Sequence, residues 1–132
     1  SHYPNCESYY GWSVADMMGD GLHLIVDGLM RKPLSLEDID GFLLGCALVI
    51  DMTVIDGPTV YDHGDHLTGV IVIAQSDIII HIKGRAVCLD IFSCMTFDEK
   101  LALRYAERFL DLVSFHAQRI QRGWDNGSPD NR

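Results

Sequence analysis

The sequence lacks a CxxC motif, a long apolar run and an excess of positive charge, and each absence excludes a class of protein. Its four cysteines (Cys6, Cys46, Cys88, Cys94) are widely spaced, so we expect free thiols and a cytoplasmic location, not a disulfide framework or a zinc–cysteine site. The apolar stretches fall well short of the roughly 20 residues of a membrane-spanning helix. We also find no secretory leader.

Basic residues are few, with 10 Lys and Arg against 19 Asp and Glu, giving a formal net charge of −9. This balance argues against a nucleic-acid partner and favours a cationic small molecule. Apolar residues make up 48% of the 132 residues, which is enough for one globular domain with a core. We expect this domain at residues 20–122, between an aromatic arm at 1–19 and a disordered tail at 123–132.

Hydrophobic periodicity predicts strands and helices in the order βαβ-βββ-αβ. The strands are expected near residues 22–27, 52–55, 68–75, 77–83, 86–94 and 115–120. Asp56-Gly57-Pro58 predicts a turn that opens a polar loop at 57–67, and Lys83-Gly84-Arg85 predicts a tight hairpin turn. The order predicts an α+β, two-layer sandwich, with two helices on one face of a mostly antiparallel sheet.

The two helices are predicted from capping residues and apolar stripes. Ser35 is the expected N-cap of the first helix, with Asp38 three residues later. Its apolar positions are Leu36, Ile39, Leu43, Leu44, Ala47 and Ile50. The second helix is expected at about 97–113, with a core stripe at Leu101, Tyr105, Phe109 and Val113.

A polar triplet, Gln75-Ser76-Asp77, interrupts an apolar stretch that runs from Gly69 to Ile82, and His81 follows it. Polar side chains next to a core cost free energy unless other groups satisfy them. Ser76 is therefore the first candidate for chemistry. The cluster at residues 62–66, Asp-His-Gly-Asp-His, offers metal-type ligands, but we interpret it as a solvated loop and expect no metal.

Two segments resemble prokaryotic S-adenosylmethionine decarboxylases. Residues 68–81 read T-G-V-I-V-I-A-Q-S-D-I-I-I-H, and residues 89–94 read L-D-I-F-S-C. The family carries S-G-V-V-x-x-A-E-S-H-I-S-I-H-T-W-P-E and then V-D-x-F-T-C. Gly21–Asp27 also fits the first strand of that family. The resemblance extends over about residues 20–113, and it is specific around Ser76, His81 and Cys94.

The resemblance implies a covalent cofactor that the chain makes from itself. Cleavage between Gln75 and Ser76 would convert Ser76 into a pyruvoyl group, which forms a Schiff base with S-adenosylmethionine and promotes its decarboxylation for polyamine synthesis. By this resemblance, His81 and Thr68 assist processing, and Cys94 returns a proton to the product. The family also implies a homodimer with shared active sites.

Departures from the family pattern suggest a divergent member with an altered substrate. Gln75 replaces a glutamate, Asp77 replaces a histidine, and the hairpin lacks the glutamate that binds ribose in the family. No adenine-stacking ring is evident unless Tyr61 serves. Ornithine or arginine is the alternative substrate, with Asp77 pairing to its distal cation, and an uncleaved, non-catalytic homologue is the other alternative.

Overall fold

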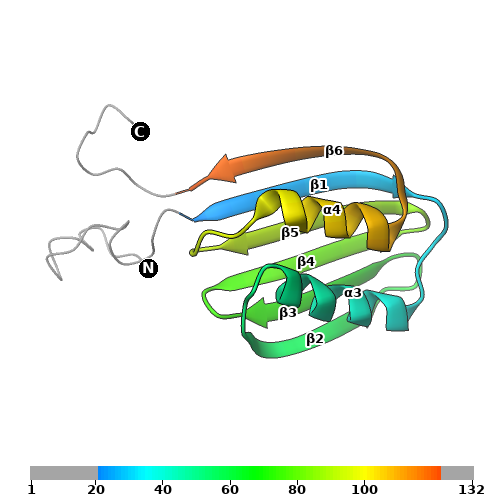
Figure 1. Ribbon diagram of the computed structural model, residues 1–132. Helices are drawn as coiled ribbons and strands as arrows, with labels where there is room; N and C mark the ends of the chain where they lie inside the picture. Colours follow the sequence, from blue (N-terminus) through cyan, green and yellow to red (C-terminus); the bar gives the residue numbers. More distant parts are fainter. Residues whose placement is uncertain (1–20, 123–132) are drawn as a thin grey trace, which may run out of the picture.

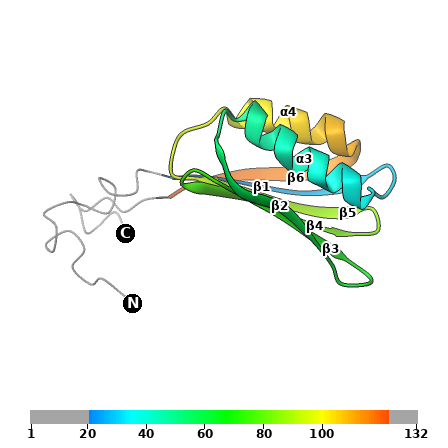
Figure 2. The ribbon, with the colours of Figure 1, turned by 90° about the horizontal axis from the view of Figure 1, so that it is seen from below.

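The computed structural model describes residues 21–122, which form one antiparallel sheet with two helices on one face (Figures 1 and 2). Figure 2 shows both helices on the same side of the sheet, while the other side carries no helix of the described chain. The predicted α+β sandwich is confirmed. The predicted arm at 1–19 and tail at 123–132 lie outside the described residues.

The sheet has six strands in the order β2-β3-β4-β5-β1-β6, and all neighbours are antiparallel. β4 and β5 lie at its centre, and β2 and β6 form its edges. The elements, in chain order, are β1 Leu22–Met30, α3 Leu36–Val49, β2 Val54–Asp62, β3 Leu67–Ile73, β4 Ser76–Lys83, β5 Ala86–Ser93, α4 Glu99–Leu110 and β6 Leu112–Gln121.

The core lies between the sheet and the two helices. Side chains alternate across a strand, and in β4 the buried positions are Ser76, Ile78, Ile80 and Ile82. The intervening positions face the side without helices, which we call the open face. The same alternation buries Ile71 and Ile73 of β3 and Leu89 and Ile91 of β5.

Helix α3 begins as predicted, because the Ser35 side chain accepts a hydrogen bond from the Asp38 N–H at 3.1 Å. Its predicted apolar stripe is partly wrong. Leu36 and Leu44 are 48% and 40% exposed. The helix packs instead through a stripe that includes Phe42 and Cys46, and its buried residues are Ile39, Phe42, Leu43, Cys46 and Ala47.

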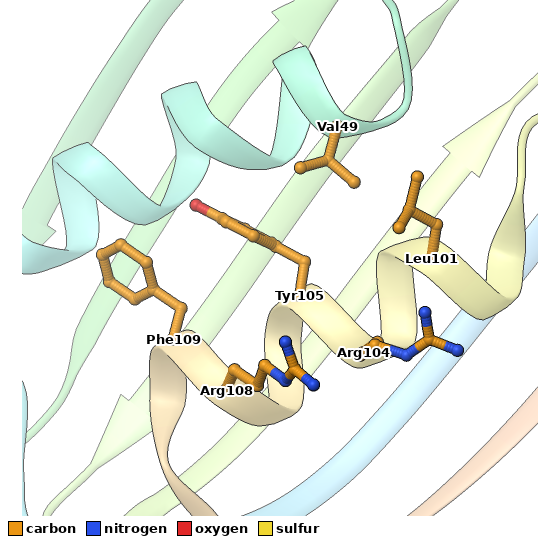
Figure 3. A pocket seen from close by; sticks show the side chains of 6 residues that line it. All are labelled: Val49, Leu101, Arg104, Tyr105, Arg108 and Phe109. Atoms are coloured by element: carbon orange, nitrogen blue, oxygen red, sulfur yellow. The ribbon is translucent and has the colours of Figure 1, made fainter.

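Helix α4 turns a different face to the sheet than predicted. Its buried residues are Ala102, Ala106 and Leu110, because small side chains let the helix approach the strands closely. The predicted core stripe is largely exposed, with Leu101 at 41% and Phe109 at 37%. Together with Tyr105 these side chains line a groove of about 420 Å³ that extends to Val49 of α3 (Figure 3).

The turn predicted at Asp56-Gly57-Pro58 is wrong, because these residues belong to the edge strand β2. The strand runs through this triplet to Asp62, and its register against β3 shifts on both sides of Asp56. Proline lacks an N–H donor, but an edge strand with an irregular register tolerates it. The loop predicted at 57–67 therefore shrinks to residues 63–66.

Residues 21–122 contain no helix that is long and apolar enough to cross a membrane. In the same range Cys46, Cys88 and Cys94 are free thiols. Burial raises the pKa of the Cys46 thiol to about 12.

Two glycines one turn apart in α3 provide a test of the helix packing. A methyl group at Gly45 would overlap the Tyr105 hydroxyl, which donates to the Phe42 carbonyl at 2.9 Å, whereas one at Gly41 meets only ordinary contact with Phe109. We expect Gly45→Ala to lower the free energy of unfolding by about 1–3 kcal/mol through overpacking. Gly41→Ala should raise it by up to about 1 kcal/mol through helix propensity.

Urea unfolding of both variants measures the difference. A Ser76→Ala background keeps the chain intact whether or not the predicted cleavage occurs. Equal effects at the two positions would contradict the packing of Tyr105 against α3.

Candidate active site

The predicted cleavage junction lies in the two-residue turn that connects β3 to β4. Ala74 and Gln75 form this turn, and Ser76 is the first residue of β4. Gln75 has a φ of 58°, in the left-handed region that side chains other than glycine seldom adopt. Such a conformation costs about 1–3 kcal/mol and persists only where the surroundings impose it. The peptide bond that follows Gln75 is the one expected to break.

The carbonyl oxygen of Gln75 accepts a hydrogen bond from the backbone N–H of Cys94, at 3.0 Å. Nucleophilic attack on this carbonyl would place negative charge on the same oxygen. A fixed N–H donor at that position stabilises such a charge. In such an attack the donor to the oxyanion would be a backbone amide, which side-chain motifs do not reveal.

The Ser76 side chain points toward the helices and is only 8% exposed. Its hydroxyl lies 2.6 Å from the Ser93 hydroxyl and 3.1 Å from the Ala74 carbonyl oxygen. Ser93 is fully buried, and β4 pairs with β5 so that the two serines are directly opposite. Ser93 is a site residue that sequence reasoning missed.

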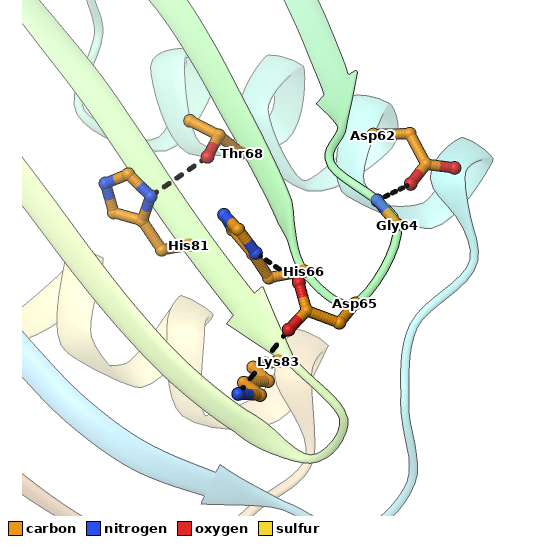
Figure 4. A network of polar contacts seen from close by, with 7 residues as sticks. All are labelled: Asp62, Gly64, Asp65, His66, Thr68, His81 and Lys83. Carbon is orange, nitrogen blue, oxygen red and sulfur yellow. Dashed lines mark hydrogen bonds and ion pairs between the residues drawn. The ribbon is translucent and has the colours of Figure 1, made fainter.

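His81 and Thr68 lie on the open face, on the other side of the sheet from the Ser76 side chain. They are cross-strand partners, and Thr68 Oγ1 is 3.1 Å from His81 Nδ1 (Figure 4). His81 follows Ser76 by five residues, which corresponds to roughly 16 Å along the strand. Within one chain the structure brings Thr68 and His81 together but not to Ser76.

The two expected substrate residues lie at opposite ends of the open face. Tyr61 of β2 is 53% exposed and pairs in register with Thr68, so it belongs to the His81 end. Asp77 is half-buried and lies next to Ser76 at the junction end. Cys94 directly follows β5 at the junction end and is half-buried.

A polar cluster surrounds Asp77 on the open face. Its cross-strand partner is Phe92, which lies edge-on to His23, with a separation of 6.1 Å between ring centroids. His23 Nε2 lies 3.0 Å from Asp90 Oδ1. Partial burial raises the pKa of Asp77, and the charge of Asp90 adds to this, while His23 and Arg122 act in the opposite direction. The cluster therefore places two carboxylates, Asp77 and Asp90, beside an aromatic ring over which the Arg122 guanidinium lies at 4.7 Å.

The loop that resembled a metal site satisfies its own polar groups. Asp65 bonds His66 at 2.7 Å and approaches Lys83 at 3.6 Å, and Asp62 accepts from the Gly64 N–H (Figure 4). Among residues 21–122 no group of three His, Cys, Asp or Glu is arranged to hold a metal ion. The loop lies at the His81 end of the sheet.

The residues that sequence reasoning missed had a signal in the second motif. Asp90, Phe92 and Ser93 all belong to the segment L-D-I-F-S-C, of which only Cys94 received a role. Alternation within that segment puts Ser93 in the core and Phe92 and Asp90 on the open face. One short segment thus supplies residues to both faces of the sheet near the junction, the core side and the open face.

Comparisons with known proteins concern the family and the fold. A family model described as S-adenosylmethionine decarboxylase matches residues 22–123. The fold is similar to the crystal structure of the adenosylmethionine decarboxylase from Aquifex aeolicus VF5, with a TM-score of 0.70 and 23% identity over 83% of this chain and 95% of that chain. At this identity the likeness concerns the fold. A comparison with curated protein sequences gave no match.

The raised pKa of Asp77 predicts a pH dependence of stability. Its folded-state pKa lies above the ordinary value of 3.8, so the folded state binds the proton more tightly than the unfolded state. Stability then falls as the pH rises between the two values. We expect Asp77→Asn to raise the free energy of unfolding at neutral pH, with the gain shrinking as the pH approaches 3.8.

Urea unfolding at several pH values, in the Ser76→Ala background, measures this gain. Asp65→Asn is a control that should change the free energy of unfolding in the opposite direction. The His66 hydrogen bond lowers the pKa of Asp65, so the charged form of Asp65 stabilises the folded state. A gain at Asp77 that does not vary with pH would refute the electrostatic explanation.

Proposed function

The chain belongs to the S-adenosylmethionine decarboxylase family, as its motifs predict, and from this premise we propose that it is a self-processing, pyruvoyl-dependent decarboxylase. Cleavage occurs before Ser76. The substrate is S-adenosylmethionine, and the product supplies polyamine synthesis, including spermidine, in the cytoplasm. The observation that carries this proposal is the junction itself, where a strained Gln75 with a hydrogen-bonded carbonyl precedes a buried serine hydroxyl.

The residues at the junction fit the formation of a pyruvoyl group. Ser76 Oγ attacks the Gln75 carbonyl carbon, the C–N bond breaks, and the hydroxyl proton ends on the Ser76 nitrogen, leaving an ester. A base then removes the Cα proton of residue 76, and elimination releases the Gln75 carboxylate. Hydrolysis of the resulting dehydroalanine, as its imine, releases ammonia. The Cys94 N–H stabilises the oxyanion of the first step, and relief of the strain at Gln75 favours it.

The chemistry of the open face suits a positively charged substrate. A pyruvoyl carbonyl at residue 76 supplies an electron sink for the carbanion that loss of CO₂ leaves. Asp77 and Asp90 offer carboxylates to a sulfonium or an ammonium, and the Phe92 ring beside them already holds a cation, the Arg122 guanidinium, 4.7 Å from its centroid. Cys94, at the same end of β5, holds the proton that returns to the product carbon.

A homodimer explains how His81 reaches the junction. Within one chain His81 is at the far end of β4, so a processing role requires it to come from a second copy. The open face also carries half-buried Ile25, Val70 and Ile79, and an apolar sheet face is stabilised when another layer covers it. We therefore assign His81 of the second copy as the base for the Cα proton, hydrogen-bonded to Thr68.

Self-cleavage is tested by denaturing mass spectrometry. We expect the wild-type chain to separate into fragments 1–75 and 76–132, the second with a pyruvoyl mass at its N-terminus, and to release CO₂ from S-adenosylmethionine. Ser76→Ala should stay intact and inactive, because it lacks the nucleophile. Asp62→Asn, at the end of β2, serves as a control that should still be cleaved.

The outcome also separates the alternatives. An intact wild-type chain would make this protein a non-catalytic homologue. A cleaved chain that releases CO₂ only from ornithine or arginine would assign it a basic amino acid as substrate. Decarboxylation by Ser76→Ala would exclude the pyruvoyl mechanism altogether.

Shared active sites predict complementation between two inactive variants. His81→Ala and Ser76→Ala should each remain uncleaved alone. In a mixed dimer, the His81→Ala chain keeps Ser76 and receives His81 from its partner, so this chain should be cleaved. Two different affinity tags isolate the mixed dimer, and mass spectrometry identifies the cut chain. A His81→Ala chain that stays intact in a confirmed mixed dimer, or that is cleaved when alone, would reject the shared site.

A further inference from the structure

Ser76 and Ser93 are the only buried polar or charged side chains in the part of the chain that the structure describes. They face each other across the β4–β5 pair and lie at the end of the core, among isoleucines and leucines. A buried hydroxyl without a partner costs free energy, and each serine supplies the partner of the other. A hydroxyl pair in this position is therefore either a structural device or part of the chemistry at Ser76.

The hydrogen bonds around the pair favour a chemical role. Each hydroxyl has one proton to donate and two lone pairs to accept. The Met95 N–H donates to Ser93 Oγ at 2.9 Å, which fixes the position of that oxygen. The Ser76 proton can point to Ser93 Oγ at 2.6 Å or to the Ala74 carbonyl at 3.1 Å. The shorter contact is at the short end of the range for hydroxyl pairs.

The geometry points to Ser93 as a catalytic residue of the acyl shift, an inference that rests on the proposed self-cleavage. When Ser76 donates its proton to Ser93, its lone pairs are free to attack the Gln75 carbonyl carbon. The bond from Ser76 Oγ to this carbon forms and the C–N bond breaks. Ser93 accepts the proton from Ser76 Oγ while its own proton passes to the departing nitrogen, so no external acid or base is consumed.

With this role, the two steps of processing, ester formation and elimination, use residues on different faces of the sheet. Ser93 and the Cys94 N–H contact the junction from the core side and the end of β5, and they serve ester formation. His81 lies on the open face, and as a base for the Cα proton it serves the elimination that follows. Variants of the two residues should therefore stop processing at different stages.

Hydroxylamine under mild conditions distinguishes these stages, because it cleaves an ester between residues 75 and 76 but leaves the Gln75–Ser76 peptide bond intact. We expect Ser93→Ala to be cleaved at least about tenfold more slowly than wild type, the effect of one lost hydrogen bond in the transition state. Hydroxylamine should not restore its cleavage, because the ester never accumulates. His81→Ala should accumulate the ester and respond to hydroxylamine. Ser93→Thr, the residue of the family motif, should restore cleavage.

Matched variants exclude a structural explanation. Lys100→Ala changes an exposed residue of α4, on the other side of the sheet from His81, and should be cleaved at the wild-type rate. Ser93→Cys retains the volume of the side chain with a much weaker hydrogen bond, so it tests the role if Ser93→Ala fails to fold. Circular dichroism and urea unfolding confirm that each variant is folded.

The possible results are distinguishable. If wild type is not cleaved, the proposed function fails and the inference with it. If wild type is cleaved and folded Ser93→Ala and Ser93→Cys match its rate, the inference is overturned while the function stands. If hydroxylamine cleaves Ser93→Ala, this variant has accumulated the ester. Ser93 would then act in the elimination step, which overturns the assigned role.

Discussion

The alternation of β4 at the centre of the sheet determines where every candidate residue can act. Ile78, Ile80 and Ile82 are buried against the helices, and a slip of one residue would expose all three. Their burial therefore forces Ser76 into the core and directs Asp77, Ile79 and His81 to the open face. The position of the reactive hydroxyl is a consequence of hydrophobic burial several residues away.

The turn before β4 brings strain and stabilisation to the same peptide group. Gln75 adopts a left-handed conformation, and the sheet maintains it because β3 and β4 are paired up to Ile73 and Ser76. The Cys94 N–H, at the end of β5, binds the carbonyl of the strained residue. Three adjacent strands thus hold one carbonyl in a fixed orientation, which is the pre-organisation that attack by a neighbouring hydroxyl requires.

Much of this arrangement could be predicted from the sequence, and the failures have physical causes. Alternating and helical periodicity predicted six strands, two helices and the N-cap at Ser35. The stripe of α4 was wrong because Ala102 and Ala106 face the sheet, and hydrophobicity alone assigns the core to larger side chains. β2 was cut short because Pro58 is a poor strand residue, but an edge strand accommodates it. The partnership of Ser93 with Ser76 depends on the β4–β5 register, which the exact length of the turn between the two strands sets and which no residue near either serine reveals. The separation of Ser76 from His81, in contrast, follows from their spacing of five residues.

The division of the sheet into a core side and an open face also explains why the altered neighbours of Ser76 affect different functions. Gln75 contributes its backbone carbonyl to the junction, and its exposed side chain makes no hydrogen bond to Ser76 or Ser93 among the contacts of the described chain. Asp77 points away from the hydroxyl pair and into the cluster of Phe92, His23 and Asp90. Under the proposed function, a substitution at 77 would therefore change the charge and shape that a substrate meets without disturbing the groups proposed to cleave the chain. Because adjacent residues of a strand face opposite sides, the proposed cofactor-forming chemistry and the proposed choice of substrate depend on different faces and could vary independently at consecutive positions.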